Sequence, residues 1–160
     1  MSRFYKRTLG WATLAGALLL CLGTTPLLSA DEPHQSDKAA LTVRVVGARN
    51  AKGTIGALLF KSVDGFPGNP KRAIREAEAH VDTTALGAEL VFQDLPDGVY
   101  AVSVRHDENG NGKFDKNILG IPKEGYGVSN NPKKMRRAPT FEEAKFTLAG
   151  ATTIEIRLIY

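Results

Sequence analysis

Cysteine is nearly absent from this chain of 160 residues, which contains one, Cys21. Because Cys21 lies in an apolar N-terminal segment, the remainder of the chain cannot form a disulfide, and its stability must come from packing or from a bound ion. Histidine is also scarce, with three residues in all. A zinc site needs cysteine or histidine ligands, so the composition argues against one.

No apolar run is long enough to predict a transmembrane helix. The longest apolar region, Leu9–Leu22, has about 14 residues, whereas a span needs ~18 or more. It follows three basic residues and precedes a sequence that ends at Ala30, which is the pattern of an export signal. We therefore predict a signal peptide at residues 1–30, a flexible leader at 31–39 and one folded domain at 40–160. The predicted location is the periplasm or the cell exterior, with no transmembrane segment in the mature chain.

The chain has little excess charge once the predicted signal is set aside. It contains 21 lysine and arginine residues against 17 acidic ones, a net charge of +4. Three basic residues and no acidic ones lie in the signal, so the mature chain carries 18 against 17, or +1. A nearly neutral domain gives no reason to expect nucleic acid as a partner. The expected partner is an unidentified protein or a component of the cell envelope.

Short segments of alternating polarity are abundant. Residues 41–45 alternate between apolar and polar side chains, and Val99–His106 does so without interruption. The second segment has no proline, so we expect it at the centre of a sheet. Thr54–Lys61 is predicted to pair back on the first strand, and Glu89–Gln93 is predicted to be a further strand.

The remaining segments carry weaker signals. Lys71–His80 favours one or two helical turns that lead into a strand near Glu78–Thr83. The alternating segments 144–148 and 154–160 flank Gly150 and are predicted to pair as a hairpin.

These segments predict an all-β protein: a single antiparallel β-sandwich of about seven strands, of immunoglobulin-like or prealbumin-like type. One irregular stretch, Asn109–Pro139, is rich in glycine at its start and is much longer than a usual connection. Such a loop is normally functional, ordered by something that it binds, or disordered.

The start of this long loop has the spacing of a calcium-binding loop. The sequence DENGNGKFD places oxygen-bearing side chains at its first, third, fifth and ninth positions and a glycine at its sixth. The predicted metal ligands are Asp107, Asn109, Asn111, the carbonyl oxygen of Lys113, and Asp115. The twelfth position, where a complete site has a bidentate glutamate, is Ile118, and Glu124 can replace it only if the chain folds back.

We expect calcium binding at this loop to be weak, with a Kd of about 10⁻⁴–10⁻³ M, because lysines lie close by and the last ligand is missing. The alternative interpretation is a glycine-rich turn without an ion. In that case Asn109-Gly110 and Asn111-Gly112 simply supply residues that tolerate positive φ.

No convincing catalytic constellation is present. His106, Asp107 and Ser129 are the residue types of a catalytic triad, but neighbours on a strand point to opposite faces, and no nucleophile-elbow pattern surrounds Ser129. We therefore predict no catalytic residues and a non-enzymatic binding or accessory module. The alternative is a hydrolase that acts on an envelope polymer through Asp107, Asp115 and Glu124.

A basic run, KKMRR at residues 133–137, has two interpretations. It can bind an anionic surface such as lipid headgroups, or it can form a solvated charged face.

Three segments resemble a known family: HDENGNGKFD, GIPKEGYGVSNN and PTFEEAKF, in this order. The bacterial family of exported proteins called domain of unknown function 2141 has the same segments at the same spacing, and the resemblance covers roughly Leu41 to Tyr160. It implies a small exported β-sandwich and carries no established activity. The segment LPDGVYAV is also similar to transthyretin-like and carboxypeptidase-regulatory-like sandwiches, which speaks to the fold alone.

Overall fold

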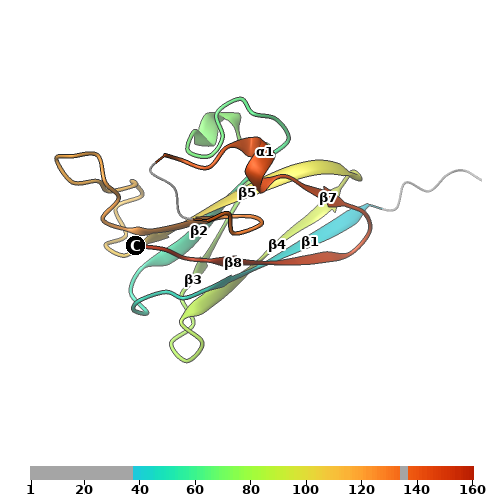
Figure 1. The fold of residues 1–160 in the computed structure, drawn as a ribbon. Coiled ribbons are helices and arrows are strands. Elements are labelled where there is room, and N and C mark those ends of the chain that lie inside the picture. The colour runs from blue at the N-terminus through green and yellow to red at the C-terminus, as the bar shows by residue number, and fades with distance from the viewer. Residues whose placement is uncertain (1–37, 134–136) are drawn as a thin grey trace, which may run out of the picture. The chain divides into compact units, whose positions relative to one another are not determined.

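The chain folds as two packed β-sheets (Figure 1). The structure is a computed structural model, and it describes residues 38–133 and 137–160. The predicted signal peptide and nearly all of the predicted leader therefore lie outside the described residues. The first strand begins at Ala39.

The smaller sheet has three strands in the order β4–β1–β8, and the larger sheet has the order β3–β2–β5–β6 with β7 also paired to β5. The strands are β1 (Ala39–Val46), β2 (Thr54–Phe60), β3 (Arg75–His80), β4 (Gly87–Leu95), β5 (Gly98–Asp107), β6 (Gly125–Val128), β7 (Phe146–Leu148) and β8 (Thr152–Arg157). Helix in the described part of the chain is limited to the 3₁₀ turn η1 (Pro70–Arg72) and the short helix α1 (Phe141–Ala144). Neither could reach across a membrane. The predicted all-β sandwich is thus confirmed, with eight strands instead of about seven.

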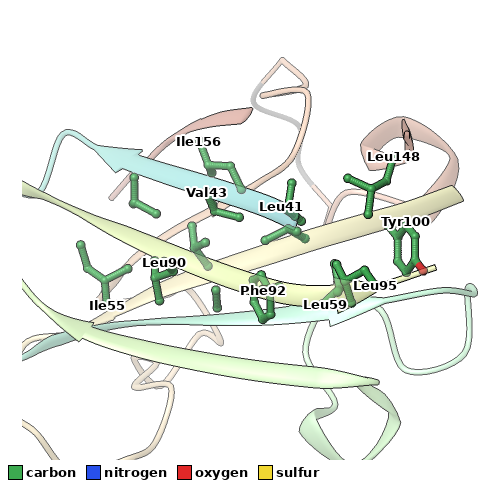
Figure 2. Packing of buried hydrophobic residues seen from close by; sticks show 14 of the residues in the cluster. Leu41, Val43, Ile55, Leu59, Leu90, Phe92, Leu95, Tyr100, Leu148 and Ile156 are labelled. Atoms are coloured by element: carbon green, nitrogen blue, oxygen red, sulfur yellow. The ribbon is translucent and has the colours of Figure 1, made fainter. Parts of the chain in front are cut away.

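The core lies between the two sheets, where their apolar faces meet (Figure 2). The labelled side chains come from the smaller sheet (Leu41, Val43, Leu90, Phe92, Leu95, Ile156) and from the larger sheet with β7 (Ile55, Leu59, Tyr100, Leu148). Alternate residues of β1 are buried and partly exposed, as the sequence pattern predicts. Each leucine-sized side chain buried here stabilises the fold by about 1.5–3 kcal/mol.

Strand β5 is central in the larger sheet, between β2 and β6, which confirms its predicted place. Its residues Tyr100, Val102 and Val104 face the core between the sheets. Its opposite face is covered as well, because Ala101 packs in a second apolar cluster with Phe60, Val128, Phe141 and Ala144. The strand that leads into the long loop is therefore buried on both sides and firmly held.

The predicted hairpin between the first two strands is wrong. Strand β1 pairs with β4 in antiparallel and with β8 in parallel fashion, while β2 pairs with β3 and β5 in the other sheet. Alternating polarity reports which face of a strand is buried, but not which neighbour pairs with its edge. The connection from 47 to 53 carries the chain across the sandwich.

The predicted C-terminal hairpin is wrong for the same reason. Strand β7 pairs with β5, whereas β8 pairs with β1 in the opposite sheet. Gly150 does lie in a turn, at φ +60°, but this turn changes sheets. Ala144, taken as part of a strand, is the last residue of α1. The parallel pairing of β1 with β8 is also an exception to the purely antiparallel arrangement that we predicted.

Two weaker predictions are corrected in detail. The helical turn expected near Lys71 is η1, in which the side chain of Asn69 accepts the N–H of Lys71, but the following strand β3 begins at Arg75, earlier than the predicted Glu78. The long stretch Asn109–Pro139 is not irregular throughout, because β6 forms within it and pairs with β5.

Candidate functional site

The loop that has the spacing of a calcium-binding loop, residues 107–115, begins where β5 ends, at the edge of the sandwich. Asp107 is the last residue of β5, lies opposite Thr54 of β2, and is only 4% exposed. Its two carboxylate oxygens accept hydrogen bonds from the backbone N–H groups of Asn111 (3.1 Å) and Gly112 (2.7 Å). A side chain placed at Gly53 would collide with the backbone oxygen of Asp107, so the close approach of the β1–β2 connection to this strand end requires glycine there.

The other predicted ligands join the same hydrogen-bonded network. The side-chain oxygens of Asn109 and Asn111 accept the N–H groups of Asn111 (3.1 Å) and Lys113 (2.7 Å). The amide nitrogens of both asparagines donate to one carboxylate oxygen of Asp115, at 2.8 and 3.1 Å. The structure therefore brings the four side chains predicted as ligands into one compact loop.

Glu124 reaches this loop because the chain folds back on itself. The N–H of Lys123 donates to the carbonyl oxygen of Asp115 (2.9 Å), and Lys116 forms a β-bridge with Pro122. One carboxylate oxygen of Glu124 accepts the N–H of Asp115 at 3.0 Å. The other oxygen, Oε1, is buried and has no hydrogen-bond partner, and the residue is 4% exposed. The chain thus folds back, as is needed for Glu124 to take the place of the missing twelfth ligand.

Ile118, which stands at the twelfth position of the pattern, is an apolar side chain and is fully exposed. Across residues 38–133 and 137–160, no three His, Cys, Asp or Glu side chains are grouped closely enough to hold a metal by themselves. A bound cation would therefore need amide and carbonyl oxygens in addition to carboxylates. Calcium accepts such a mixed set of six to eight oxygens.

The loop is fastened at both ends by Arg49 of the β1–β2 connection. Its guanidinium lies 2.7 Å from Oε1 of Glu108 and also donates to the carbonyl oxygen of Lys123 (3.0 Å). Asn50 donates to the second oxygen of Glu108 (2.7 Å). Burial raises the pKa of the Glu108 carboxyl, but the hydrogen bonds from Arg49 and Asn50 and the charge of Arg49 outweigh this, so the net shift of its pKa is downward.

Sequence reasoning missed these anchors. Arg49 and Glu108 are 59 positions apart, and nothing local to either residue marks the pair. The only available signal was the cluster of turn residues at 47–53 next to a predicted strand, which does not identify a partner.

His106 has a structural role in the observed geometry. It is fully buried, its Nε2 lies 2.7 Å from the carbonyl oxygen of Lys52, and its Nδ1 lies 2.7 Å from the hydroxyl of Tyr160. Since a carbonyl can only accept, Nε2 donates to it, and Nδ1 forms a hydrogen bond with the tyrosine hydroxyl. The tyrosine oxygen in turn accepts the N–H of Arg49 (3.0 Å), and burial raises the pKa of its hydroxyl.

The three residues of the hypothetical triad do not meet in any described hydrogen bond. Ser129 is buried, donates to the carbonyl oxygen of Ala144 (2.6 Å) and accepts the N–H of Val102 (3.0 Å), so it ties α1 to β5. His106 instead bonds to Lys52 and Tyr160, and Asp107 accepts the loop N–H groups. A shallow depression lined by residues 70 and 73–76 lies near the far end of β2 and contains none of the loop carboxylates.

The basic run is described only at its two ends. Arg137 forms two hydrogen bonds with the carboxylate of Glu143, at 2.8 and 2.9 Å, so its charge is already paired. Lys133 is exposed. Residues 134–136, which hold the rest of the run, lie outside the described residues.

Comparisons with known proteins place the chain without assigning it an activity. No curated protein and no solved structure matches it. Residues 43–155, which include the entire loop from Asp107 to Glu124, match the model of one protein family. The chain belongs to the family described as an uncharacterized protein conserved in bacteria (DUF2141).

Proposed function

We propose that this protein is an exported, non-enzymatic binding module whose 107–124 loop holds a calcium ion weakly. The ligands would be the oxygens of Asp107, Asn109, Asn111, Asp115, the carbonyl oxygen of Lys113 and, in addition, the carboxylate of Glu124. The predicted export signal at residues 1–30 favours a periplasmic or extracellular location, where calcium is a common structural ion. The partner would be a protein or another component of the cell envelope.

The observation that carries this proposal is the buried, unpartnered Oε1 of Glu124. A carboxylate oxygen removed from water without a hydrogen-bond partner costs stability, commonly about 1–3 kcal/mol and more when the group is charged. A glycine-rich turn without an ion does not require a buried carboxylate oxygen that lacks a partner. A cation beside it would offset the cost, so Glu124 favours the ion over the plain turn.

Calcium fits this loop better than magnesium does. The loop offers carboxylate, amide and carbonyl oxygens from a short, turning segment, and calcium tolerates irregular sets of such ligands. Magnesium demands octahedral geometry and gives up its waters reluctantly. The ion would replace the two asparagine amide groups as the partner of the Asp115 carboxylate.

The geometry supports binding over hydrolysis. Both oxygens of Asp107 accept loop N–H groups, and Asp115 and Glu124 are joined through the backbone N–H of Asp115. A glycoside hydrolase holds two carboxyl groups on either side of a bound substrate, about 5–9.5 Å apart. The loop carboxylates instead hydrogen-bond with the loop itself, which is the arrangement of a structural or ion-binding turn.

Calorimetric titration of calcium into the wild-type protein and two variants tests the proposal. Glu124→Gln keeps the shape of the side chain and removes its charge, while Glu78→Gln makes the same change on the exposed edge strand β3. We expect a Kd of about 10⁻⁴–10⁻³ M for the wild type and for Glu78→Gln, and at least about tenfold weaker binding for Glu124→Gln. Equal affinities for all three proteins, or no heat of binding for the wild type, would contradict the proposal.

A further inference from the structure

We call residues 107–115 the ion loop, and the turn beyond it carries an unusual concentration of exposed apolar side chains. We call residues 116–123 the tip. Its three large apolar residues are Ile118 (102% exposed), Leu119 (77%) and Ile121 (56%). The segment runs out from the end of β5 and returns to β6, beyond the packed part of the sheets (Figure 1). Clusters of this kind on a soluble protein mark interaction sites.

The tip is rigidly preformed by its own hydrogen bonds. The side-chain oxygen of Asn117 accepts the N–H groups of Leu119 and Ile121, both at 2.9 Å. The backbone of Asn117 donates to Ile121 (2.8 Å) and accepts from Gly120 (2.9 Å), whose φ of +75° closes the turn. The apolar side chains are therefore held outward, and four backbone N–H groups are satisfied without water.

The charges around the tip have one sign. Every exposed charged side chain from 112 to 123 is a lysine, namely Lys113, Lys116 and Lys123. The two carboxylates of the region do not offset them at the surface, because Asp115 is half-buried in the ion loop and Glu124 is buried. Three exposed apolar side chains and three exposed lysines thus lie on the same short stretch of the chain, with no exposed acidic side chain among them.

We propose that the tip inserts into the surface of a lipid bilayer that contains anionic lipids. Ile118, Leu119 and Ile121 would enter the interface between headgroups and acyl chains, and the lysines would lie at the level of the phosphates. The four backbone N–H groups that are already satisfied within the tip lower the cost of its entry into an apolar medium. A protruding turn with exposed apolar side chains and only basic exposed charges matches an anionic bilayer more closely than a protein groove.

This inference does not depend on calcium, because Asn117 sets the geometry of the tip. Binding to vesicles is therefore measured in EDTA, so that its outcome is separate from that of the calcium titration. The vesicles are made of phosphatidylcholine, with or without phosphatidylglycerol as the anionic lipid.

A tryptophan placed in the tip reports insertion directly. The single tryptophan of the chain, Trp11, lies in the predicted signal peptide, so the mature protein of residues 31–160 has none and each reporter variant carries one. Leu119→Trp carries the probe in the tip, and Val63→Trp carries it at an exposed position (68%) after the far end of β2. We expect anionic vesicles to shift the emission of the Leu119 variant to shorter wavelength and to leave that of the Val63 variant unchanged. Unchanged emission from the Leu119 variant, or equal shifts from both, would overturn the inference.

Cosedimentation with the same vesicles measures the two components of binding. Replacing Ile118, Leu119 and Ile121 together by serine should lower the partition coefficient about 100-fold or more, since each fully inserted side chain contributes about tenfold or more and partial insertion contributes less. Replacing Lys113 and Lys116 by glutamine should lower it about fivefold per lysine on anionic vesicles alone. Circular dichroism confirms that the variants are folded. A folded triple-serine variant that sediments as the wild type does would show that the tip is not the contact.

Discussion

Asp107 and Glu124 are both carboxylates with 4% exposure, yet their surroundings differ. Two backbone N–H groups satisfy Asp107, whereas one oxygen of Glu124 has no partner. Asp107 can therefore be explained by the turn alone, because it fastens the Gly-rich loop to the end of β5. The turn alone does not explain Glu124. One acceptor oxygen is enough to hold the N–H of Asp115, so the second, buried carboxylate oxygen adds a burial cost and no hydrogen bond.

A prediction at the scale of single residues concerns the core beneath the loop. Val102 is completely buried at the centre of β5, so Val102→Asp places a carboxylate without a partner between the sheets. We expect a loss of about 3 kcal/mol or more in the free energy of unfolding, measured by denaturant titration. Val99→Asp, on the same strand at a position 43% exposed, should change it by about 0.5 kcal/mol or less. Similar losses in the two variants would contradict the central placement of β5.

At the scale of elements, α1 shows how a helix of four residues is held in place. Thr140 and Glu143 form a reciprocal capping box, and Arg137 pairs with the same glutamate. The helix buries Phe141 and Ala144 against the outer face of β5, and Ser129 binds its last carbonyl group. Capping, an ion pair and packing together substitute for the length that an isolated helix would need.

The pH dependence of this element follows from Glu143. Hydrogen bonds from Arg137, then from the backbone and side chain of Thr140, lower the pKa of its carboxyl from 4.5 to about 2. A carboxyl with a depressed folded-state pKa stabilises the fold above its unfolded-state pKa, and this contribution is lost as the pH falls from about 4.5 through 2.

We predict that the carboxyl carbon of Glu143, followed by NMR, titrates with a midpoint near 2 in the wild type, and that Arg137→Gln moves this midpoint upward. The reason is that Arg137 supplies the largest of the three contributions. A midpoint unaffected by Arg137→Gln would show that the ion pair does not form in solution.

The elements also show where sequence reasoning works and where it stops. The buried faces of β1 and β5 follow from alternation, because each residue of a strand reports its own side of the sheet. The partners of β2 and β8 do not follow from it, since edge pairing depends on contacts far away in the chain. The two turn glycines of the ion loop, Gly110 and Gly112, have positive φ as their Asn-Gly sequences predict. The return of Glu124 rests on the hydrogen bond from Lys123 to Asp115 and on the contact of Arg49 with Lys123, and no local pattern in the sequence records these contacts.

At the scale of the whole molecule, both candidate sites lie on one excursion of the chain, between the end of β5 and the start of β6. The ion loop occupies its base and the apolar tip its far end, and the N–H of Lys123 joins the two through Asp115. The sandwich holds this excursion in place, because β5 is buried on both faces and Arg49 of the β1–β2 connection binds Glu108 and Lys123. Ion binding at the base should therefore stabilise the fold as a unit.

The central claim, that the 107–124 loop binds calcium through Asp107 and Glu124, is tested most directly by thermal unfolding with and without calcium. With a Kd of about 1 mM, ~10 mM calcium stabilises the folded state by about 1.4 kcal/mol, which raises the Tm of a domain of this size by roughly 3–6 °C. We predict this rise for the wild type, little or none for Asp107→Ala and Glu124→Gln, and a smaller one for the wild type with magnesium. Equal rises in the wild type and the two variants would contradict the claim and leave the loop as a turn.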